Sequence, residues 1–191
     1  LIIEGIDLEL ISSFTQKIGF PTGRLQKIKK DNITVYIDYA HTPEALENAL
    51  VELKRFHNYP VWCLFGCGGD RDKKKRPLMT KIANKFCKKI YLTDDNPRNE
   101  SPFKIRNDIK RGIKKKVFFE IPNRKKAILK ALMNLNTGDI LLVAGRGHEN
   151  IQDYGKRKII FSDKKIILDL IKLKNKSLSK NLKLNIIREQ S

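Results

Sequence analysis

The spacing of hydrophobic residues changes period repeatedly along the chain and predicts alternating strands and helices. Apolar residues follow helical spacing from Leu8 to Ile18, and Gly19 with Pro21 ends that pattern. Beyond it, short apolar or alternating runs predict strands, and amphipathic segments predict the helices between them. The predicted strands are 25–28, 34–37, 61–65, 90–93, 117–119 and 140–144, and the predicted helices are 43–56, 77–87, 102–113 and 124–135.

This order of elements predicts an α/β fold. Strands that alternate with helices favour a Rossmann-like, mostly parallel sheet with helices on both faces. After Gly147 the pattern is less regular: residues 154–160 indicate a turn and one late antiparallel strand, and residues 163–173 a last amphipathic helix. We therefore expect one main domain over residues 23–173, preceded by a linker segment, 1–22, and followed by a frayed or disordered basic tail, 174–191.

The charge of the chain raises the question of a nucleic-acid partner. The 191 residues include 40 Lys and Arg against 21 Asp and Glu, a net charge of +19. The basic blocks at 73–76, 110–116 and 172–183 are scattered and contain few aromatic residues on which bases could stack. We expect a basic solvent-exposed surface and no nucleic-acid partner, with a basic nucleic-acid-binding α/β domain as the alternative.

Other features of the composition favour a cytoplasmic protein with no membrane partner. No apolar run approaches the roughly 18 residues of a membrane span, and Glu4 interrupts the opening apolar residues where a secretory signal would continue. Cys63, Cys67 and Cys87 are odd in number and lie beside apolar stretches, which is typical of reduced core thiols. Their spacing does not fit the usual zinc-binding pairs, so no metal site is expected.

Four polar loops follow predicted strands, and they are the candidate functional region. These loops cover residues 38–43, 66–72, 94–98 and 145–149. In an open parallel sheet, ligands bind beyond the carboxyl ends of the strands, where such loops lead into helices. We therefore expect all four loops to share one edge of the sheet.

The residue types in these loops suit a small ligand with several charges. The glycine-rich 66–69 segment would let the backbone approach a ligand closely. Arg71 and Arg98 can each bind a carboxylate through two parallel hydrogen bonds, and Asp95 and Glu149 can each bind an ammonium group. Two cations and two acids favour an amino acid with more than one charged end over a long polyanion.

Each of these signals also has a purely structural interpretation. The 66–69 segment matches neither the Walker nor the dinucleotide pattern and could be a tight turn, and residues 94–98 could be a helix cap. His41 and His148 could be hydrogen-bonded loop residues, and His57 is expected to be structural. What favours a ligand site is that all these signals fall on one predicted sheet edge.

The same loops carry motifs of a known family. Asp38-Tyr-Ala-His-Thr-Pro43, Phe65-Gly-Cys-Gly-Gly-Asp-Arg-Asp72, Lys75-Arg-Pro-Leu-Met79, Thr93-Asp-Asp-Asn-Pro-Arg98 and Ala144-Gly-Arg-Gly-His-Glu149 closely resemble the C-terminal region of the Mur ligases, in order and at similar spacing. The resemblance extends from the first residues to about residue 172. It identifies segment 1–22 as the end of a ligase central domain and segment 23–173 as the C-terminal amino-acid-binding domain.

The resemblance implies a role in peptidoglycan synthesis. It implies an ATP-dependent ligase that adds meso-diaminopimelate to UDP-MurNAc-L-Ala-D-Glu, with ATP and Mg²⁺ held mainly by domains that precede this one. By the same resemblance, the residues that bind diaminopimelate are Arg71, Asp95, Asn96, Pro97, Arg98, Gly145 and Glu149. Those that bind the nucleotide are Arg24, Asp38 and His41, and no catalytic residue or metal ligand is expected.

The chain also departs from the family pattern. Gln26 and Lys74 replace residue types that are usual in the family, and no Gly-Lys-Thr phosphate loop is present. We therefore expect this chain alone to be inactive as a ligase, since the reacting groups would lie between domains. A non-catalytic remnant of a ligase is a further alternative.

Overall fold

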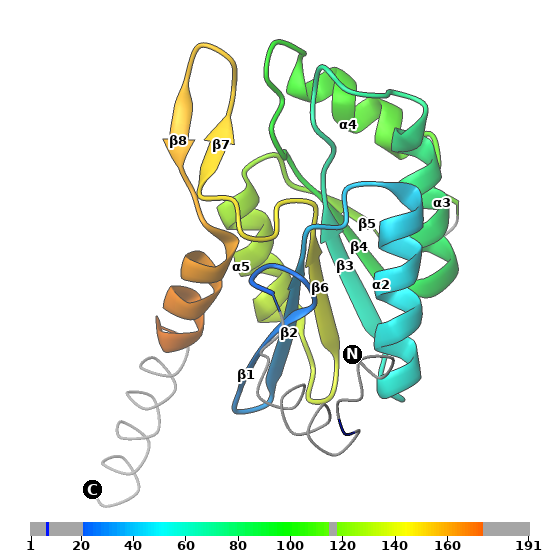
Figure 1. The fold of residues 1–191 in the computed structure, drawn as a ribbon, viewed down its shortest axis with the longest axis vertical. Coiled ribbons are helices and arrows are strands. Elements are labelled where there is room, and N and C mark those ends of the chain that lie inside the picture. Colours follow the sequence, from blue (N-terminus) through cyan, green and yellow to red (C-terminus); the bar gives the residue numbers. More distant parts are fainter. Residues whose placement is uncertain (1–6, 8–20, 115–117, 174–191) are drawn as a thin grey trace, which may run out of the picture.

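A six-stranded sheet forms the centre of the protein (Figure 1). The computed structural model describes Asp7 and residues 21–114 and 118–173, so the helix predicted before Ile18 and the tail from Lys174 lie outside the described residues. The strands are β1 (Gln26–Lys30), β2 (Ile33–Asp38), β3 (Val61–Phe65), β4 (Lys89–Leu92), β5 (Phe118–Glu120), β6 (Ile140–Ala144), β7 (Ile151–Asp153) and β8 (Lys158–Ile160). The helices are α2 (Pro43–Phe56), α3 (Lys75–Phe86), α4 (Pro102–Lys110) and α5 (Arg124–Asn134), together with residues 163–173.

The strand order confirms the mostly parallel sheet. The order is β1-β2-β6-β3-β4-β5, and every neighbouring pair except β1–β2 is parallel. The prediction of one late strand was incomplete, because β8 pairs with β7 in a separate antiparallel hairpin. Strand β7 has only three residues, with Gln152 as its buried one, which is too short to show a strand period.

Helices cover both faces of the sheet, as predicted (Figure 1). Side chains alternate along each strand, so Cys63 and Phe65 of β3 point to one face and Trp62 and Leu64 to the other. The first face packs against α2, α3 and α4, and the second against α5 and residues 163–173. The central strands β3 and β6 are therefore buried on both sides, which explains their nearly continuous apolar runs.

The parallel register brings the four polar loops to one edge of the sheet. Asp38 at the end of β2 pairs with Ala144 at the end of β6, and Phe65 at the end of β3 pairs with Leu92 at the end of β4. Strand β6 lies between β2 and β3. The loop after β6 therefore lies between the loops after β2 and β3, although it is the last of the four in the chain. The expectation that these loops share an edge is confirmed.

The apolar interior also contains the three cysteines. All three thiols are buried, as expected of core residues, and burial raises the pKa of Cys67 to about 12. A thiol with so high a pKa is a poor nucleophile at neutral pH.

Within the described residues, no helix is both long and apolar enough to cross a membrane.

A buried ion pair joins α5 to the last helical segment. Arg124, at the first position of α5, is only 1% exposed and donates from Nε and Nη2 to the two carboxylate oxygens of Asp163, each at 2.8 Å. Its Nη2 also donates to the carbonyl oxygen of Ala144, at the end of β6. Burial disfavours the charge on Arg124, but the Asp163 carboxylate raises its pKa above the ordinary value.

Two further arginines connect the loop between β4 and α4 to the neighbouring helices. Arg76 of α3 donates to Glu100 at 2.8 Å and to Asp108 of α4 at 3.0 Å. Arg106 of α4 donates to Asp94 and, at 2.9 Å, to Glu120 at the end of β5. The loop is therefore attached at both of its ends by charged hydrogen bonds.

We expect Asp163→Asn to destabilise the fold strongly. The change removes the negative partner of a fully buried arginine, which typically costs about 3–5 kcal/mol. The free energy of unfolding, measured by urea denaturation, should fall by that order. Asp169→Asn, an exposed position on the same helical segment, is the control and should change stability little. Equal effects of the two changes would contradict the importance of the Arg124 pair.

We expect Glu100→Gln to remove part of the acid sensitivity of the protein. The hydrogen bond from Arg76 lowers the pKa of Glu100 to about 2 from the usual 4.5. Its stabilising contribution is thus present above pH 4.5 and is lost as the pH falls towards 2. At pH 7 the variant should lose about 2 kcal/mol, and the difference from wild type should shrink below pH 4.5.

The measurement for Glu100 is the free energy of unfolding as a function of pH. Glu52→Gln is the matched control, because Glu52 forms only an exposed ion pair with Arg55 at 3.9 Å. A difference between Glu100→Gln and wild type that stays constant from pH 7 to pH 2 would contradict the assignment.

Candidate functional site

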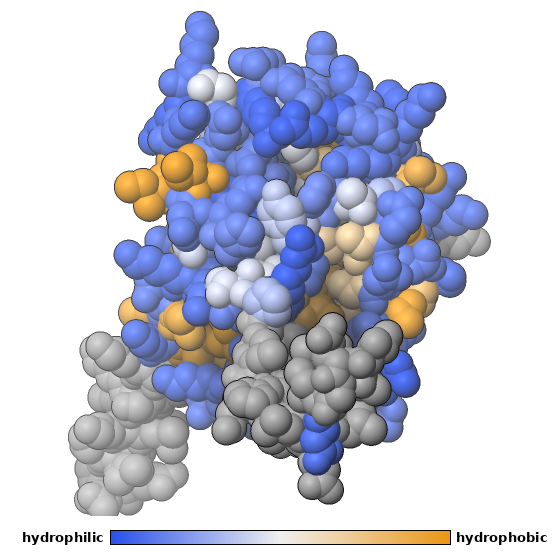
Figure 2. All heavy atoms as spheres, viewed as in Figure 1, coloured by the Kyte–Doolittle hydropathy of each residue, from blue (hydrophilic) through white to orange (hydrophobic). Residues whose placement is uncertain are grey.

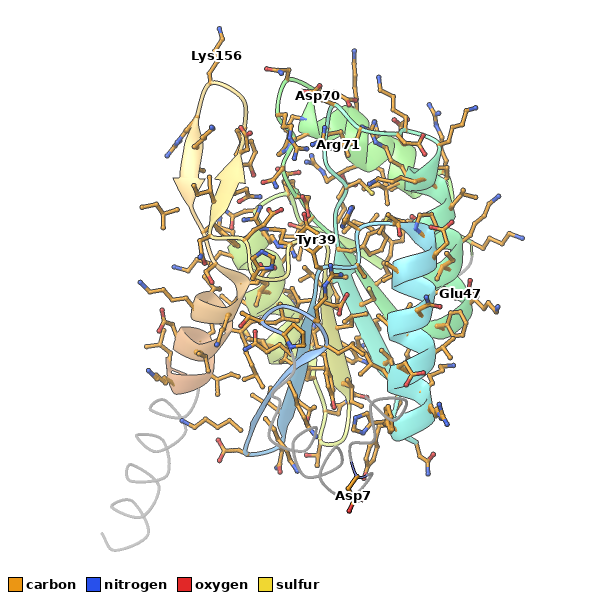
Figure 3. The ribbon with its side chains drawn as sticks, in the orientation of Figure 1. Asp7, Tyr39, Glu47, Asp70, Arg71 and Lys156 are labelled. Atoms are coloured by element: carbon orange, nitrogen blue, oxygen red, sulfur yellow. The ribbon has the colours of Figure 1, made fainter. Side chains whose placement is uncertain are left out.

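A cleft of about 510 Å³ opens at the carboxyl edge of the sheet and receives residues from all four polar loops. Its lining includes six of the seven residues that the family resemblance assigned to diaminopimelate. These are Arg71, Asp95, Asn96, Arg98, Gly145 and Glu149. In Figure 3, Arg71 and Tyr39, which both line the cleft, lie in the region between the β7–β8 hairpin and helices α2 to α4. In Figure 2, hydrophilic residues cover most of this end of the molecule in the view shown.

Two guanidinium groups line the cleft. Arg71 is exposed and donates from Nη1 to the backbone carbonyl of Asp70 at 3.0 Å. Arg98 donates from Nη1 to the carbonyl of Gly69 at 2.8 Å. Within the described residues neither guanidinium forms an ion pair with a carboxylate, and each group has five N–H donors. Both can therefore still bind an anionic group of a ligand.

The backbone of Arg98 has an unusual conformation. Its φ is +51°, a left-handed value that non-glycine residues rarely adopt. The neighbouring hairpin stabilises this conformation, because Arg98 donates its backbone N–H to the carbonyl of Asp153 at 3.0 Å. Strained conformations of this kind cluster at ligand sites.

Two carboxylates also line the cleft, and Asp95 is the more buried of the two. Asp95 is 7% exposed, and its Oδ1 accepts the backbone N–H of Asn96 at 2.7 Å. Its Oδ2 is buried and has no hydrogen-bond partner among the described residues. Glu149 accepts from Nδ2 of Asn96 at 2.8 Å through Oε2. An unpartnered buried carboxylate oxygen is costly, and Oδ2 has almost no solvent-accessible surface in the ligand-free protein.

The glycines of the 66–69 segment have different surroundings. Gly68 lines the cleft, so the expectation that the backbone there approaches a ligand stays a prediction, whereas a Cβ at Gly66 or Gly69 would collide with the backbone carbonyl of Thr93 or Pro97. These two glycines let the loops after β3 and β4 pack backbone to backbone. Pro97 itself is absent from the lining of the cleft and contributes through this packing.

The three residues assigned to the nucleotide do not line one cavity. His41 lines the main cleft, whereas Arg24 and Asp38 line a separate hollow of about 320 Å³ beside α2. Both carboxylate oxygens of Asp38 accept backbone N–H groups, from Leu25 at 2.6 Å and Ala40 at 2.7 Å. Asp38 therefore has a structural role in fixing this turn, whatever else it binds.

Two residues that support the cleft were not singled out from the sequence. Arg146 of the 145–149 loop is fully buried and donates to Oδ1 of Asn96 at 2.7 Å. Gln152 of β7 donates from Nε2 to the carbonyl of Asp95 at 2.7 Å. An arginine directly after a buried strand was a visible signal for the first, but nothing in the sequence links Gln152 to a loop 57 residues away.

The described residues do not provide a metal site. No group of three or more His, Cys, Asp or Glu side chains among them is arranged to hold a metal ion. The family resemblance assigns Mg²⁺ mainly to domains that precede this one.

Comparison with known proteins places the chain among the Mur ligases. The family model described as "Mur ligase, glutamate ligase domain" matches residues 23–147. A protein of Rickettsia montanensis named UDP-N-acetylmuramoyl-L-alanyl-D-glutamate–2,6-diaminopimelate ligase is 49% identical over 153 residues, which are 79% of this chain and 32% of that protein. A protein of Prochlorococcus marinus with the same name is 46% identical over 179 residues, 91% of this chain and 35% of its own length.

Solved structures with a similar fold include a protein of the same name as these relatives. One, described as a structure of the same diaminopimelate ligase, has a TM-score of 0.77 and 40% identity, and the match covers 90% of this chain and 36% of that one. A folylpolyglutamate synthase/dihydrofolate synthase from Yersinia pestis, at 19% identity and a TM-score of 0.58, shares the fold. This chain spans about a third of the length of the relatives it matches. On the family model and on these identities, the chain belongs to the Mur ligase family.

Proposed function

We propose that this chain is the amino-acid-binding part of an ATP-dependent ligase that joins meso-diaminopimelate to UDP-MurNAc-L-Ala-D-Glu in the cytoplasm. The substrate is the one that the names of the relatives give. Within this proposal, residues 23–173 are the amino-acid-binding domain, and residues 1–22 and 174–191 are a linker and a basic tail.

The observation that carries the proposal is the charge arrangement of the cleft. The guanidinium groups of Arg71 and Arg98 have no carboxylate partner in the described structure, and the acids Asp95 and Glu149 line the same cleft. meso-Diaminopimelate carries two carboxylates and two amino groups, so its ends can pair with both kinds of side chain. Lysine lacks one of the two carboxylates and would leave an arginine without a partner, which costs free energy in a partly buried site.

In the proposed reaction this chain binds and orients the amino acid. The ligase activates the carboxylate of the D-glutamate residue with ATP as an acyl phosphate, and the amine of diaminopimelate then displaces phosphate to form the amide. The four charged side chains of the cleft would hold one end of diaminopimelate and leave the other amine to react. Such positioning contributes through proximity, because it turns an encounter between two molecules into a reaction within one complex.

A second group of contacts surrounds Tyr39, which lines the main cleft. Arg24 lies over the ring of Tyr39, 5.1 Å from its centroid, and His41 packs edge-on against the same ring at 4.7 Å. Tyr39 therefore connects the main cleft to the hollow lined by Arg24 and Asp38. We propose that ATP contacts this side of the chain through Arg24, Asp38 and His41.

The proposal is tested by titrating the chain with amino acids and following amide signals by NMR. We expect meso-diaminopimelate to shift signals of the loops at 66–72, 93–101 and 145–149, and L-lysine to bind more weakly. Shifts that are equal for both amino acids, or that fall outside these loops, would count against the proposal.

Arg98→Ala should lower the affinity for meso-diaminopimelate by about 10-fold to 100-fold, the usual range for a lost charge-assisted hydrogen-bond pair. Affinity for L-lysine should change much less, so the preference between the two ligands should shrink. Both dissociation constants are measured by the same NMR titration. Arg111→Ala, at an exposed surface pair with Asp108, is the matched control. An unchanged ratio of the two constants would remove Arg98 from this role.

Glu149→Gln should weaken binding of ligands that carry a distal amine. The change keeps the size of the side chain but removes the charge that pairs with an ammonium group, so the affinity for meso-diaminopimelate should fall about 10-fold. The ligand 2-aminopimelate, which lacks that amine, serves as the control and should bind wild type and variant alike. If the substitution weakened both ligands equally, Glu149 would not be the ammonium partner.

A further inference from the structure

Arg146 lies beneath the cleft rather than in its lining. Its side chain is 0% exposed, and its Nη2 donates to the backbone carbonyls of Ile151 at 2.8 Å and Phe161 at 3.3 Å. Its guanidinium carbon is also 5.4 Å from the centroid of the Phe161 ring. These contacts, on both sides of the β7–β8 hairpin, fix the position of the guanidinium group.

From this position Arg146 determines which way the Asn96 amide faces. Nη1 of Arg146 donates to Oδ1 of Asn96 at 2.7 Å, and the backbone N–H of Asp153 donates to the same oxygen at 2.9 Å. An NH₂ group cannot accept either bond, so the amide oxygen must face these two donors. Nδ2 is thereby turned towards Oε2 of Glu149, at 2.8 Å.

Arg146 also supplies positive charge under the acidic side of the cleft. The nearest carboxylate oxygen to its guanidinium in the described structure is Oε2 of Glu149, at 3.6 Å from Nη1, beyond normal hydrogen-bond length. Burial and the nearby charge of Arg124 lower its pKa, and Asp95, Asp163 and Glu149 act in the opposite direction. The acids of the cleft therefore take part in balancing a buried cation whose ion pair with Glu149 is longer than a hydrogen bond.

We infer that Arg146 is a positioning residue that presets the acidic side of the cleft through Asn96. It fixes the orientation of the Asn96 amide, and this amide holds Glu149 before any ligand arrives. A preset site binds more tightly because the ligand does not have to order these side chains. The effect on affinity rests on the proposed function, whereas the fixed amide is a property of the ligand-free protein.

The variants are Arg146→Met, which removes the donors and the charge, and Arg146→Lys, which keeps the charge but places its donors on one flexible ammonium group. Arg157→Met is the matched control, since Arg157 is exposed in the turn of the same hairpin, next to Lys156 at its tip (Figure 3). We expect Arg146→Met to weaken meso-diaminopimelate at least about 10-fold, Arg146→Lys to recover part of this loss, and Arg157→Met to match wild type.

A double-mutant cycle with Glu149→Gln separates positioning from a general structural effect. If Arg146 acts through Glu149, adding Arg146→Met to Glu149→Gln should cause little further loss of affinity. Losses that simply multiply would contradict the inference.

A ligand-free readout distinguishes this inference from the proposed function. In the wild type, the side-chain NH₂ signals of Asn96 should be separate and slow to exchange with solvent, and Arg146→Lys or Arg146→Met should accelerate that exchange. A wild-type amide that exchanges freely would overturn the inference even if neither variant folds. If the amide is fixed as expected but meso-diaminopimelate does not bind, the proposed function fails and the positioning role stands.

Discussion

The conformation of the loop between β4 and α4 depends on hydrogen bonds from segments spread over the whole domain. Arg76 of α3 holds Glu100, Arg106 of α4 holds Asp94, Gln152 of β7 holds the backbone at Asp95, and Arg146 holds Asn96. This loop carries three of the cleft residues, so the cleft has its shape only when α3, α4, β6 and the hairpin are all in place. The site is therefore a product of the tertiary structure rather than of a local motif.

Buried charges make this arrangement specific, because each one is costly unless it is paired. Three buried arginines, Arg76, Arg106 and Arg124, each donate to two carboxylate oxygens. The cleft is different: Oδ2 of Asp95 has no partner, and Arg146 has no carboxylate within hydrogen-bond length in the described structure. Unpaired polar atoms also occur away from the cleft, at Trp62, Arg76, Asn84 and Arg124, but the buried carboxylate oxygen without a partner in the described structure belongs to a residue of the cleft.

The sequence predicted the repetitive elements well and the irregular ones poorly. The predicted bounds of α2, β3 and β6 agree with the structure. A proline at the first helical position marks the start of α2, and continuous apolar runs mark β3 and β6. Strand β7 was missed, because three residues are too few to show a period. The packing role of Gly66 and Gly69 was not foreseen, because the carbonyls that exclude a side chain there come from a loop some thirty residues later. Arg146 was visible, but its contact with Asn96 spans 50 positions.

The burial of the acids in the cleft bears on the high net charge of the protein. A chain with a charge of +19 attracts polyanions at long range, but a specific site must also match them at contact. Here Asp95 is almost fully buried and Glu149 partly buried in the cleft, while Arg71 is exposed. A phosphate attracted by Arg71 would be repelled by the carboxylates of the cleft, because it carries no positive charge. A ligand with both a carboxylate and an ammonium group could instead pair its carboxylate with an arginine and its ammonium group with an acid. The placing of exposed Arg71 above buried Asp95, rather than the summed charge, is therefore what suits the zwitterion of the proposed function.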